Sequence, residues 1–395
     1  MSEQKSPATR SWTAPLKALG RGVAVPLLAV ATALLIGALL IIFTDTTVIA
    51  AFGDGIGQGF KRGWEVISVA YGAFFFGAFG DLYHITETLR IATPYIFAGL
   101  AVAVGFQGGL FNVGAEGQYF IGGLTSVFVG YSITGLPWYI HLPLALLAGA
   151  AGGALWGGIV GLLKAKTGAH EVINTIMMNY IAYRLAEFML DVGGPMARPG
   201  YRPVSPEIQP SAYLPQFVPS DTTIRFNVGF FLALAAAVFV WWLLFKTTLG
   251  YEIRTVGHNP RAARYAGISV PRIIVITMLL SGALAGLAAP MDILGVIHFM
   301  PNAFASGYGF DAIALALLGN SHPGGVVIAS LLFGALRAGA SNMQGVAKIP
   351  IDITSILQGL IIVFIAAPAI IRAIYRLRGL EKGEGLITTR GWGQM

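Results

Sequence analysis

The chain of 395 residues is 55% hydrophobic and only 11% charged, and its mean hydropathy is +0.72. Soluble domains carry about 25% charged residues, so this composition excludes a soluble globular protein and predicts that most of the chain lies in lipid. The net charge of +7 does not indicate nucleic-acid binding, because the cations gather at the ends of apolar segments and form no basic face. Cysteine is absent, which excludes disulfides and thiolate metal sites.

The N-terminal half contains five apolar segments, each long enough to cross a bilayer at about 20 residues per crossing. They lie at residues 22–43, 85–106, 112–131, 139–163 and 170–190. The polar, basic residues 1–21 form a predicted cytoplasmic tail, and the first apolar segment is too long for a signal peptide. Residues 44–82 mix charges, glycines and aromatic side chains, which favours an interfacial or half-inserted segment.

The C-terminal half contains five further apolar segments, at residues 226–245, 273–290, 308–319, 326–341 and 353–371. We therefore predict an all-α polytopic membrane protein with about ten transmembrane helices and a transmembrane domain at residues 22–371. The proline-rich residues 191–225 are a predicted external loop, and the basic residues 372–395 a predicted cytoplasmic tail. With both termini inside, most of the 25 lysines and arginines lie in cytoplasmic segments, as the positive-inside rule requires.

Glycines repeat at every fourth position on two of the predicted spans. The repeats are Gly149, Gly153, Gly157 and Gly161 on the fourth span, and Gly282 and Gly286 on the seventh. Helices in lipid associate through small faces that let their backbones approach closely. We expect these faces to pack against neighbouring helices, and a sliding interface used for gating is the alternative.

A strongly polar stretch, residues 250–272, separates the sixth and seventh spans, and its positive excess places it in the cytoplasm. Asn259 as an N-cap followed by Pro260 predicts a short helix, which Gly267 can end. Such a basic helix suits the docking of a soluble partner, whereas the alternative is an ordinary positive-inside loop. The candidate docking residues are Arg254, His258, Asn259, Pro260, Arg261, Arg264, Tyr265 and Gly267.

Polar residues also follow glycines at predicted membrane depth. Asn112 and Glu116 are four residues apart and would share one face of a helix. An intramembrane carboxylate is costly unless it is paired or faces water, so it indicates a functional site; the alternative is that Glu116 only caps free backbone N–H groups. Asp311 follows glycines in the second half in the same way, which suggests broken helices and a site between two repeats.

The candidate pathway residues combine aromatic rings with hydrogen-bonding groups. They are Phe111, Asn112, Glu116, Gln118, Tyr119, Phe310 and Asp311, with His298 and Asn302 at a predicted outer mouth, although His298 alone is also compatible with a packing role. The phosphate-binding motif GxxxxGK[ST] and the hydrolase motifs HExxH and GxSxG are absent from the sequence. We therefore expect no ATPase site, no catalytic residue and no metal or other cofactor in this chain.

Three stretches of the sequence resemble the permease subunits of bacterial ABC importers for branched-chain amino acids, ribose and nucleosides. They read NVGAEGQYFIGG, VGHNPRAARYAGI and GFDAIALALLGNSHPGG, the last followed by LLFGALRAGASNMQ, and the resemblance covers about residues 87–371. The third stretch is most similar to the nucleoside and simple-sugar branch. The resemblance implies a type II importer fold in the bacterial cell (inner) membrane, and a coupling helix at residues 254–267 that enters a cleft on an ATPase.

The same resemblance implies the partners of the chain. They are a second permease subunit, homologous or identical, cytoplasmic ABC ATPases that bind the ATP, and an extracytoplasmic substrate-binding lipoprotein. Two other classes stay open from the residues alone, an ion-coupled secondary transporter and a membrane-embedded enzyme or sensor. The sequence also does not separate a nucleoside from ribose or another simple sugar as the substrate.

Overall fold

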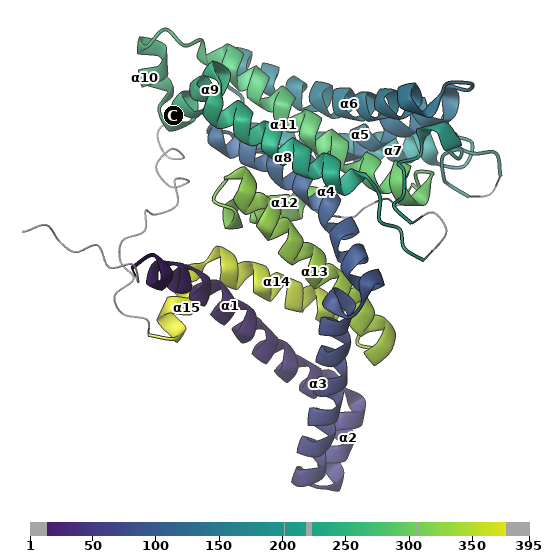
Figure 1. Cartoon of the computed structure of the whole chain (residues 1–395), viewed down its shortest axis with the longest axis vertical. Coiled ribbons are helices and arrows are strands. Elements are labelled where there is room, and N and C mark those ends of the chain that lie inside the picture. The colour runs from purple at the N-terminus through teal and green to yellow at the C-terminus, as the bar shows by residue number, and fades with distance from the viewer. Residues whose placement is uncertain (1–13, 201, 219–222, 303, 305–306, 377–395) are drawn as a thin grey trace, which may run out of the picture. The chain divides into compact units, whose positions relative to one another are not determined.

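The computed structural model describes residues 14–200, 202–218, 223–302, 304 and 307–376. Within these ranges the regular structure is helical, apart from two isolated β-bridges, Val204↔Pro301 and Gln216↔Asn227 (Figure 1). The predicted tails fall largely outside the described residues. The chain divides into two compact units, one built from described residues 14–73 and 343–376 and the other from residues 74–342.

The larger unit is a bundle in which α4, α5, α6, α8 and α11 run side by side (Figure 1). Its helices are α4 (Leu82–Gln107), α5 (Ala115–Ser132), α6 (Trp138–Thr167), α7 (Glu171–Leu190), α8 (Gly229–Lys246), α9 (Thr248–His258), α10 (Pro260–Tyr265), α11 (Val270–Asp292) and α12 (Tyr308–Leu318). Two single turns, η1 (Pro210–Ala212) and η2 (Ile293–Ile297), and most of α13 (Pro323–Ala347) complete it. Helix α4 is the most buried of the long helices and contacts α8, α11 and α12.

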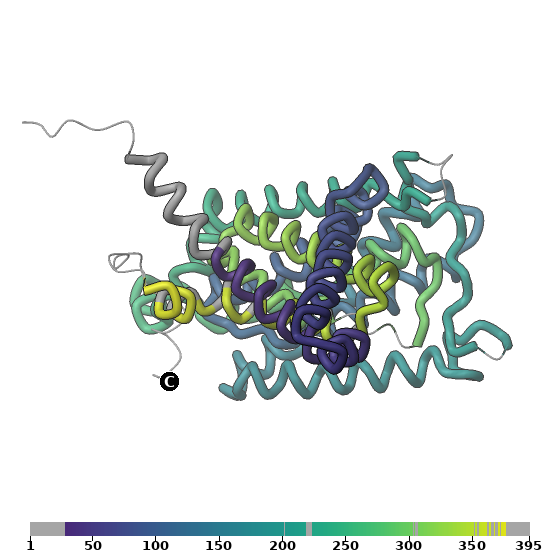
Figure 2. The backbone as a smooth tube through the Cα atoms, turned by 90° about the horizontal axis from the view of Figure 1, so that it is seen from below, coloured from purple at the N-terminus to yellow at the C-terminus, as the bar shows by residue number. Residues whose placement is uncertain are grey.

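The smaller unit contains α1 (Ala14–Thr44), α2 (Thr46–Asp54), most of α3 (Ile56–Phe79), α14 (Ile351–Ala366) and α15 (Pro368–Ile374). Figure 2 shows residues 28–44 of α1 with α2 and α3 in purple to blue, and the coloured part of α15 in yellow. The Tyr71 hydroxyl on α3 donates to the Leu34 carbonyl on α1, and Thr32 Oγ1 lies 2.9 Å from Tyr375 Oη. Residues 44–82, predicted as an interfacial or half-inserted segment, are thus mainly two consecutive helices.

Each of the ten predicted apolar segments contains a helix, which confirms the all-α polytopic class. By length and composition, five of the described helices could cross a membrane alone, namely α4, α6, α8, α13 and α11 extended to Ile297. The bent pair Leu28–Thr44 and Thr46–Asp54, with a 69° angle, would make a sixth span. The other predicted spans correspond to α5, α7, α12 and α14, which are shorter or more polar. By length and composition, the described helices therefore give six spans at most, fewer than the ten predicted.

Two segment boundaries differ from the prediction for identifiable reasons. Helix α5 begins at Ala115, after a turn at residues 113–114, so Asn112 lies outside the helix and does not share a helical face with Glu116. The tenth apolar segment is split at Ala367 into α14 and α15, since Pro368 has no N–H with which to continue the helix. In addition, the polar stretch 250–272 contains most of α9 besides the predicted short helix, and the start of α9 is capped by the Thr247 hydroxyl.

The glycine repeats lie where the backbones of α6 and α11 meet. A β-carbon placed on Gly153 would lie 2.2 Å from the carbonyl oxygen of Gly282, and one placed on Gly282 would lie 2.2 Å from that of Gly153. A β-carbon on Gly286 would lie 2.4 Å from the carbonyl oxygen of Gly149, and one on Gly122 of α5 would lie 2.2 Å from that of Gly286. The predicted packing role of these glycines is confirmed, since no other residue fits at this separation.

We predict that Gly153→Val destabilises the purified protein by about 3 kcal/mol, because the added side chain must displace the backbone of α11. Denaturant titration in detergent micelles measures this loss. The matched control is Gly345→Val on α13, where a β-carbon would have no neighbour within 4 Å. Equal stability of the two variants would show that the α6–α11 contact does not require glycine.

Candidate functional site

The two glycine-interrupted segments, one from each half of the chain, meet in the structure. Glu116, in the first turn of α5, reaches the start of α12. Its Oε1 accepts a hydrogen bond from the Gly307 N–H at 3.2 Å, and its Oε2 accepts one from the Gly309 N–H at 2.6 Å. A β-carbon on Gly309 would lie 2.2 Å from the Glu116 backbone nitrogen, so the two helix starts are in backbone contact.

Glu116 therefore acts as a cap, but for the helix of the opposite half. The first N–H groups of a helix have no acceptor within it, and a carboxylate there is stabilised by the helix dipole. The side chain is almost completely buried, so these two bonds replace its hydration. The sequence alternative of a capping carboxylate describes its contacts correctly, and the capped helix is α12.

Asn112 belongs to a packed hydrogen-bond network between helices. Its Nδ2 donates to Gln118 Oε1 and to Ser281 Oγ, both at 2.8 Å. Its Oδ1 accepts from the Gly114 N–H at 3.0 Å and from Gln118 Nε2 at 3.1 Å. The Ser281 hydroxyl in turn donates to the Ala101 carbonyl of α4 at 2.6 Å. Since the amide of Asn112 is fully used, this network fixes α4, α5 and α11 together.

Asp311 ends a second chain of hydrogen bonds. Arg337 Nη1 donates to Tyr95 Oη at 2.8 Å, and Tyr95 Oη donates to Asp311 Oδ2 at 2.7 Å. The Arg337 guanidinium also lies over the ring of Tyr308, 4.8 Å from its centroid. Asp311 is only half-buried, and the side chain of Phe310 beside it is 47% exposed.

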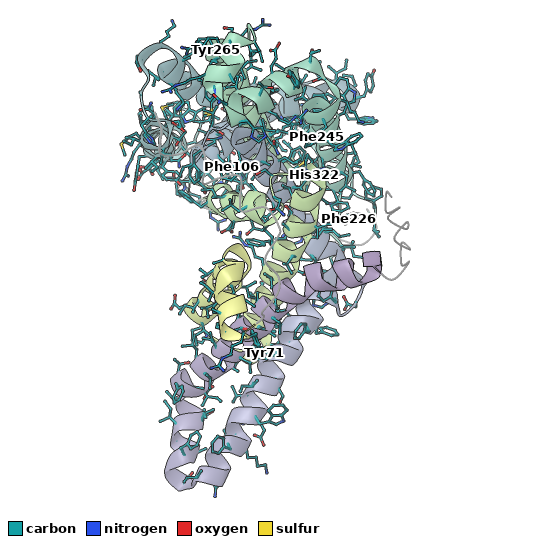
Figure 3. The ribbon with its side chains drawn as sticks, turned by 90° about the vertical axis from the view of Figure 1, so that its left-hand side faces the viewer. Tyr71, Phe106, Phe226, Phe245, Tyr265 and His322 are labelled. Carbon is teal, nitrogen blue, oxygen red and sulfur yellow. The ribbon has the colours of Figure 1, made fainter. Side chains whose placement is uncertain are left out.

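The other predicted aromatic residues pack inside the bundle. Tyr119 is buried and stacks on Phe304, with ring centroids 5.4 Å apart. Phe111 is half-buried against Phe106, which is labelled in Figure 3, with centroids 5.3 Å apart. Of the predicted pathway aromatics Phe111, Tyr119 and Phe310, Phe310 is the one classed as exposed.

An ion-pair cluster near the start of α4 was not identified as a site from the sequence. Arg90 donates to both carboxylate oxygens of Glu87, at 2.6 and 2.9 Å, and to Asp292 Oδ1 at 3.0 Å. Arg225 adds a bond to Glu87 at 3.0 Å. Glu87 and Arg90 are three residues apart at the start of a predicted span, and this spacing could have indicated their pairing. Asp292 is 202 positions from Arg90, so no local pattern connects them.

His298 and Asn302 lie where residues 202–214 fold against the segment that follows α11. The imidazole of His298 stacks on the ring of Tyr213, with centroids 3.7 Å apart, and its carbonyl accepts from the Ile208 N–H. Burial lowers the pKa of His298, and the negative charge of Glu207 opposes this shift. The Asn302 N–H donates to the Pro203 carbonyl at 2.9 Å. Both residues therefore support the fold of this loop.

The predicted docking helix is present as α10, at the end of the bundle shown at the upper left of Figure 1. Asn259 Oδ1 accepts from the N–H groups of Arg261 and Ala262, both at 3.0 Å. Gly267 has a φ of +82°, and the Ile268 N–H returns to the Ala263 carbonyl, which closes the helix as a Schellman motif. The predicted N-cap and terminating glycine are both confirmed.

Most of the predicted docking residues are exposed on this helix. Tyr265, labelled in Figure 3, is 95% exposed, and Arg261, Arg264 and His258 are also exposed. Arg254 differs, because its Nε donates to the Leu244 carbonyl at 3.0 Å and its guanidinium lies over the Phe245 ring. Arg254 therefore joins α9 to α8.

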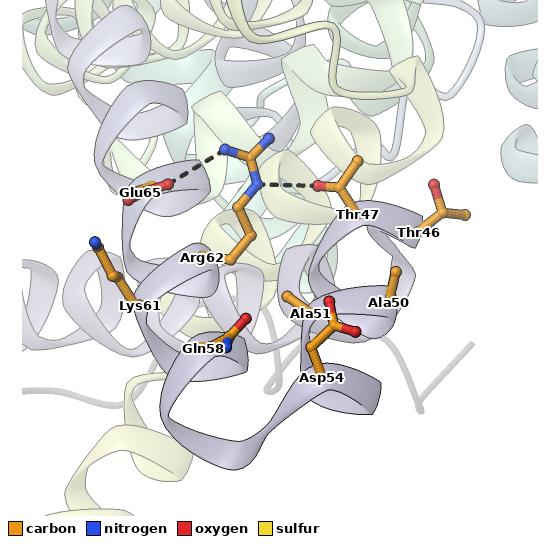
Figure 4. Close-up of a pocket in the computed structure, with 9 residues that line it drawn as sticks. All are labelled: Thr46, Thr47, Ala50, Ala51, Asp54, Gln58, Lys61, Arg62 and Glu65. Carbon is orange, nitrogen blue, oxygen red and sulfur yellow. Dashed lines mark hydrogen bonds and ion pairs between the residues drawn. The ribbon is translucent and has the colours of Figure 1, made fainter.

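One hollow in the described chain lies in the smaller unit and contains none of the predicted site residues. It has a volume of about 660 Å³ and is lined by α2 and α3 (Figure 4). Arg62 extends across it, bonded to Glu65 at 3.2 Å and to Thr47 at 3.3 Å. An apolar groove of about 340 Å³ lies between α4, α8 and α11. No group of His, Asp or Glu side chains suited to a metal ion occurs among the described residues.

These features define a polytopic helical membrane protein with an exposed basic helix outside its spans. Residues 84–366 match the family described as branched-chain amino acid transport system / permease component. The chain belongs to this family, and it is the permease component of an ABC transporter, as the resemblance in the sequence implied. No solved structure matches the chain.

Three relatives show which kinds of ABC transporter permease the chain is similar to. The chain is 42% identical to the guanosine ABC transporter permease protein NupP of Bacillus subtilis, over 89% of this chain and 94% of that protein. It is 37% identical to the glucose ABC transporter permease protein TsgB13 of Haloferax volcanii, over 75% and 79% of the two chains. It is 33% identical to the nucleoside ABC transporter permease protein NupB of Lactococcus lactis, over 90% of this chain and 93% of that protein.

We predict that Glu116→Gln lowers the free energy of unfolding by about 2 kcal/mol. The amide keeps one acceptor oxygen, but its NH₂ group would face the Gly307 or Gly309 N–H and stay unpaired in a buried position. Denaturant titration in micelles is the measurement. Glu187→Gln, in an exposed ion pair with Arg184, is the control and should change stability little. A Glu116→Gln protein as stable as the control would remove the capping role.

Proposed function

We propose that this chain is the permease subunit of an ATP-driven importer whose substrates are nucleosides. The observation that carries the proposal is the 42% identity over nearly the whole length of a relative named for guanosine transport. The exposed ring of Phe310 beside the half-buried carboxylate of Asp311 supports it, because a base stacks on an aromatic face and sugar hydroxyls donate to a carboxylate.

The partners in this proposal are a second permease subunit, cytoplasmic ABC ATPases that bind the ATP, and an extracytoplasmic binding lipoprotein. The assembly lies in the bacterial cell membrane, with residues 250–272 on the cytoplasmic side. Support comes from the family and from α10, a short helix that is capped at both ends and presents arginines to solvent. A partner can drive transport only by binding two conformations of the permease with different affinity.

The contacts of α9 support a mechanical route from α10 into the bundle. A β-carbon on Gly257 would lie 2.1 Å from the Gln107 carbonyl, so the end of α9 rests directly on the end of α4. Gln107 Nε2 donates to the Ser321 carbonyl, in the turn after α12, at 3.0 Å. Displacement of α10 by the ATPase is therefore expected to move α4 and α12.

A simple sugar is the second candidate substrate. The 37% identity to a relative named for glucose transport supports it. The nucleoside proposal has the broader support, since relatives named for guanosine and nucleosides match 94% and 93% of their own lengths.

The substrate is tested with the complete transporter in proteoliposomes containing internal ATP and external binding protein. We expect uptake of radiolabelled guanosine that needs hydrolysable ATP and is reduced by excess inosine but not by excess glucose. Liposomes with a non-hydrolysable ATP analogue are the control. ATP-dependent uptake of labelled glucose without uptake of guanosine would favour the second candidate.

Coupling through α10 is tested with Arg261→Glu. We predict that this variant loses about tenfold or more of its uptake, because the reversed charge opposes docking on a surface suited to arginine. The variant should still insert and remain stable, since the Arg261 side chain is exposed. Uptake and the co-purification of the ATPase are the two measurements.

Two further variants control this experiment. Arg198→Glu makes the same charge change at an exposed position in the loop after α7 and should leave uptake unchanged. Ser269→Cys provides a single exposed thiol in a chain without cysteine and should react only from the cytoplasmic side. Normal uptake by Arg261→Glu with an assembled transporter would refute coupling through this residue.

A further inference from the structure

The carboxylates around the α5–α12 junction differ in how their oxygens are used. Both oxygens of Glu116 accept from backbone N–H groups, and both oxygens of Glu87 accept from arginines. Asp311 accepts from Tyr95 through Oδ2, while its Oδ1 has no hydrogen bond within the part of the chain that the structure describes. Asp311 is also half-buried rather than buried, so a ligand can approach its carboxylate.

The two hydrogen bonds that link Arg337, Tyr95 and Asp311 have only one possible donor-to-acceptor direction. A guanidinium has no acceptor, so Arg337 must donate to the Tyr95 oxygen. The Tyr95 proton is then directed to Asp311 Oδ2. Tyr95 is 2% exposed, and Arg337 is held over the ring of Tyr308, so the two side chains behind the carboxylate are fixed by packing. The Asp311 carboxylate is thereby oriented, with Oδ1 left to accept a hydrogen bond.

A carboxylate oxygen beside an exposed aromatic ring suits a particular kind of ligand. The carboxylate only accepts hydrogen bonds, so it requires a ligand with O–H or N–H donors. The ring of Phe310, the adjacent residue, offers an apolar face for a base or for the C–H face of a sugar. Adjacent hydroxyls on a pentose ring meet the first requirement without introducing charge.

We propose that Asp311 is a specificity-determining residue that reads the 2′- and 3′-hydroxyls of ribonucleosides, and that Tyr95 and Arg337 position its carboxylate. The inference rests on the proposed nucleoside transport and adds to it which part of the substrate is selected. A site built to hydrogen-bond a hydroxyl discriminates strongly against the analogue that lacks it, because its own polar group is then left unpaired.

The test compares uptake of guanosine with uptake of 2′-deoxyguanosine and of 3′-deoxyguanosine by the complete transporter. The same binding protein is used throughout, so its own preference is constant and a changed ratio comes from the permease. We expect the wild-type protein to prefer guanosine and Asp311→Asn to lower that preference about tenfold, the value of one hydrogen bond to a charged group. Asp352→Asn, an exposed aspartate on α14, is the matched control and should keep the wild-type ratio.

A second variant separates recognition from folding. Tyr95→Phe keeps the ring and removes the hydroxyl that orients Asp311, so the preference for guanosine should fall in the same direction. The inference is overturned if Asp311→Asn keeps the wild-type ratio of guanosine uptake to deoxyguanosine uptake. If Asp311→Asn does not assemble, an unchanged ratio in Tyr95→Phe overturns it. A wild-type transporter that takes up all three nucleosides equally also overturns it while the proposed function stands. Absence of nucleoside uptake by the wild type refutes the proposed function and this inference with it.

Discussion

The start of α12 depends on one carboxylate. A backbone N–H group without an acceptor costs several kcal/mol where water is excluded, and the break before α12 leaves such groups at Gly307 and Gly309. Glu116 binds both of them from the first turn of α5. This requires the two helix starts to be in contact, and the absence of a side chain at Gly309 makes that approach possible. The arrangement brings Asp311, in the first turn of α12, next to Tyr95 of α4.

An unpaired charge is also costly where water is excluded, and this cost explains how several ionisable side chains of the bundle are paired. Arg90 neutralises Glu87 and Asp292 at one end of α4, and Arg225 adds the fourth charge, so the cluster is balanced. Arg337 carries its charge against two aromatic rings and the Tyr95 hydroxyl. Charges inside a membrane protein are expected to be paired or functional. Asp311 combines pairing through Oδ2 with an Oδ1 that has no hydrogen bond within the described bundle.

Features fixed by neighbouring residues could be predicted from the sequence. The short helix α10 follows from Asn259, Pro260 and Gly267, whose local hydrogen bonds and backbone angles define its two ends. The glycine faces of α6 and α11 follow from their spacing of four. The helices of the ten apolar segments follow from length and composition, whereas the split at Ala367 shows that a single proline overrides an apolar run.

Contacts between distant residues could not be predicted in this way. Glu116 is recognisable as an unusual carboxylate, but the N–H groups that it caps lie 191 and 193 positions away. Tyr95 and Asp311 are 216 positions apart. Asn112 and Gln118 were grouped with the pathway because polar residues in a span indicate function, yet Ser281 and the turn before α5 use their amides for packing. A polar residue in a span thus has two physical explanations, and its partners decide between them.

These partners also determine how a motion can pass through the bundle. Helix α12 is tied to α4 near both of its ends, through Tyr95 and Asp311 at one and through Gln107 and Ser321 at the other. It is tied to α5 through Glu116 at its start. Because α9 rests on the end of α4, a displacement of α9 reaches α12 by way of α4. Because Asn112, Gln118 and Ser281 also fix α4 to α5 and α11, such a displacement is expected to carry α5 and α11 with it.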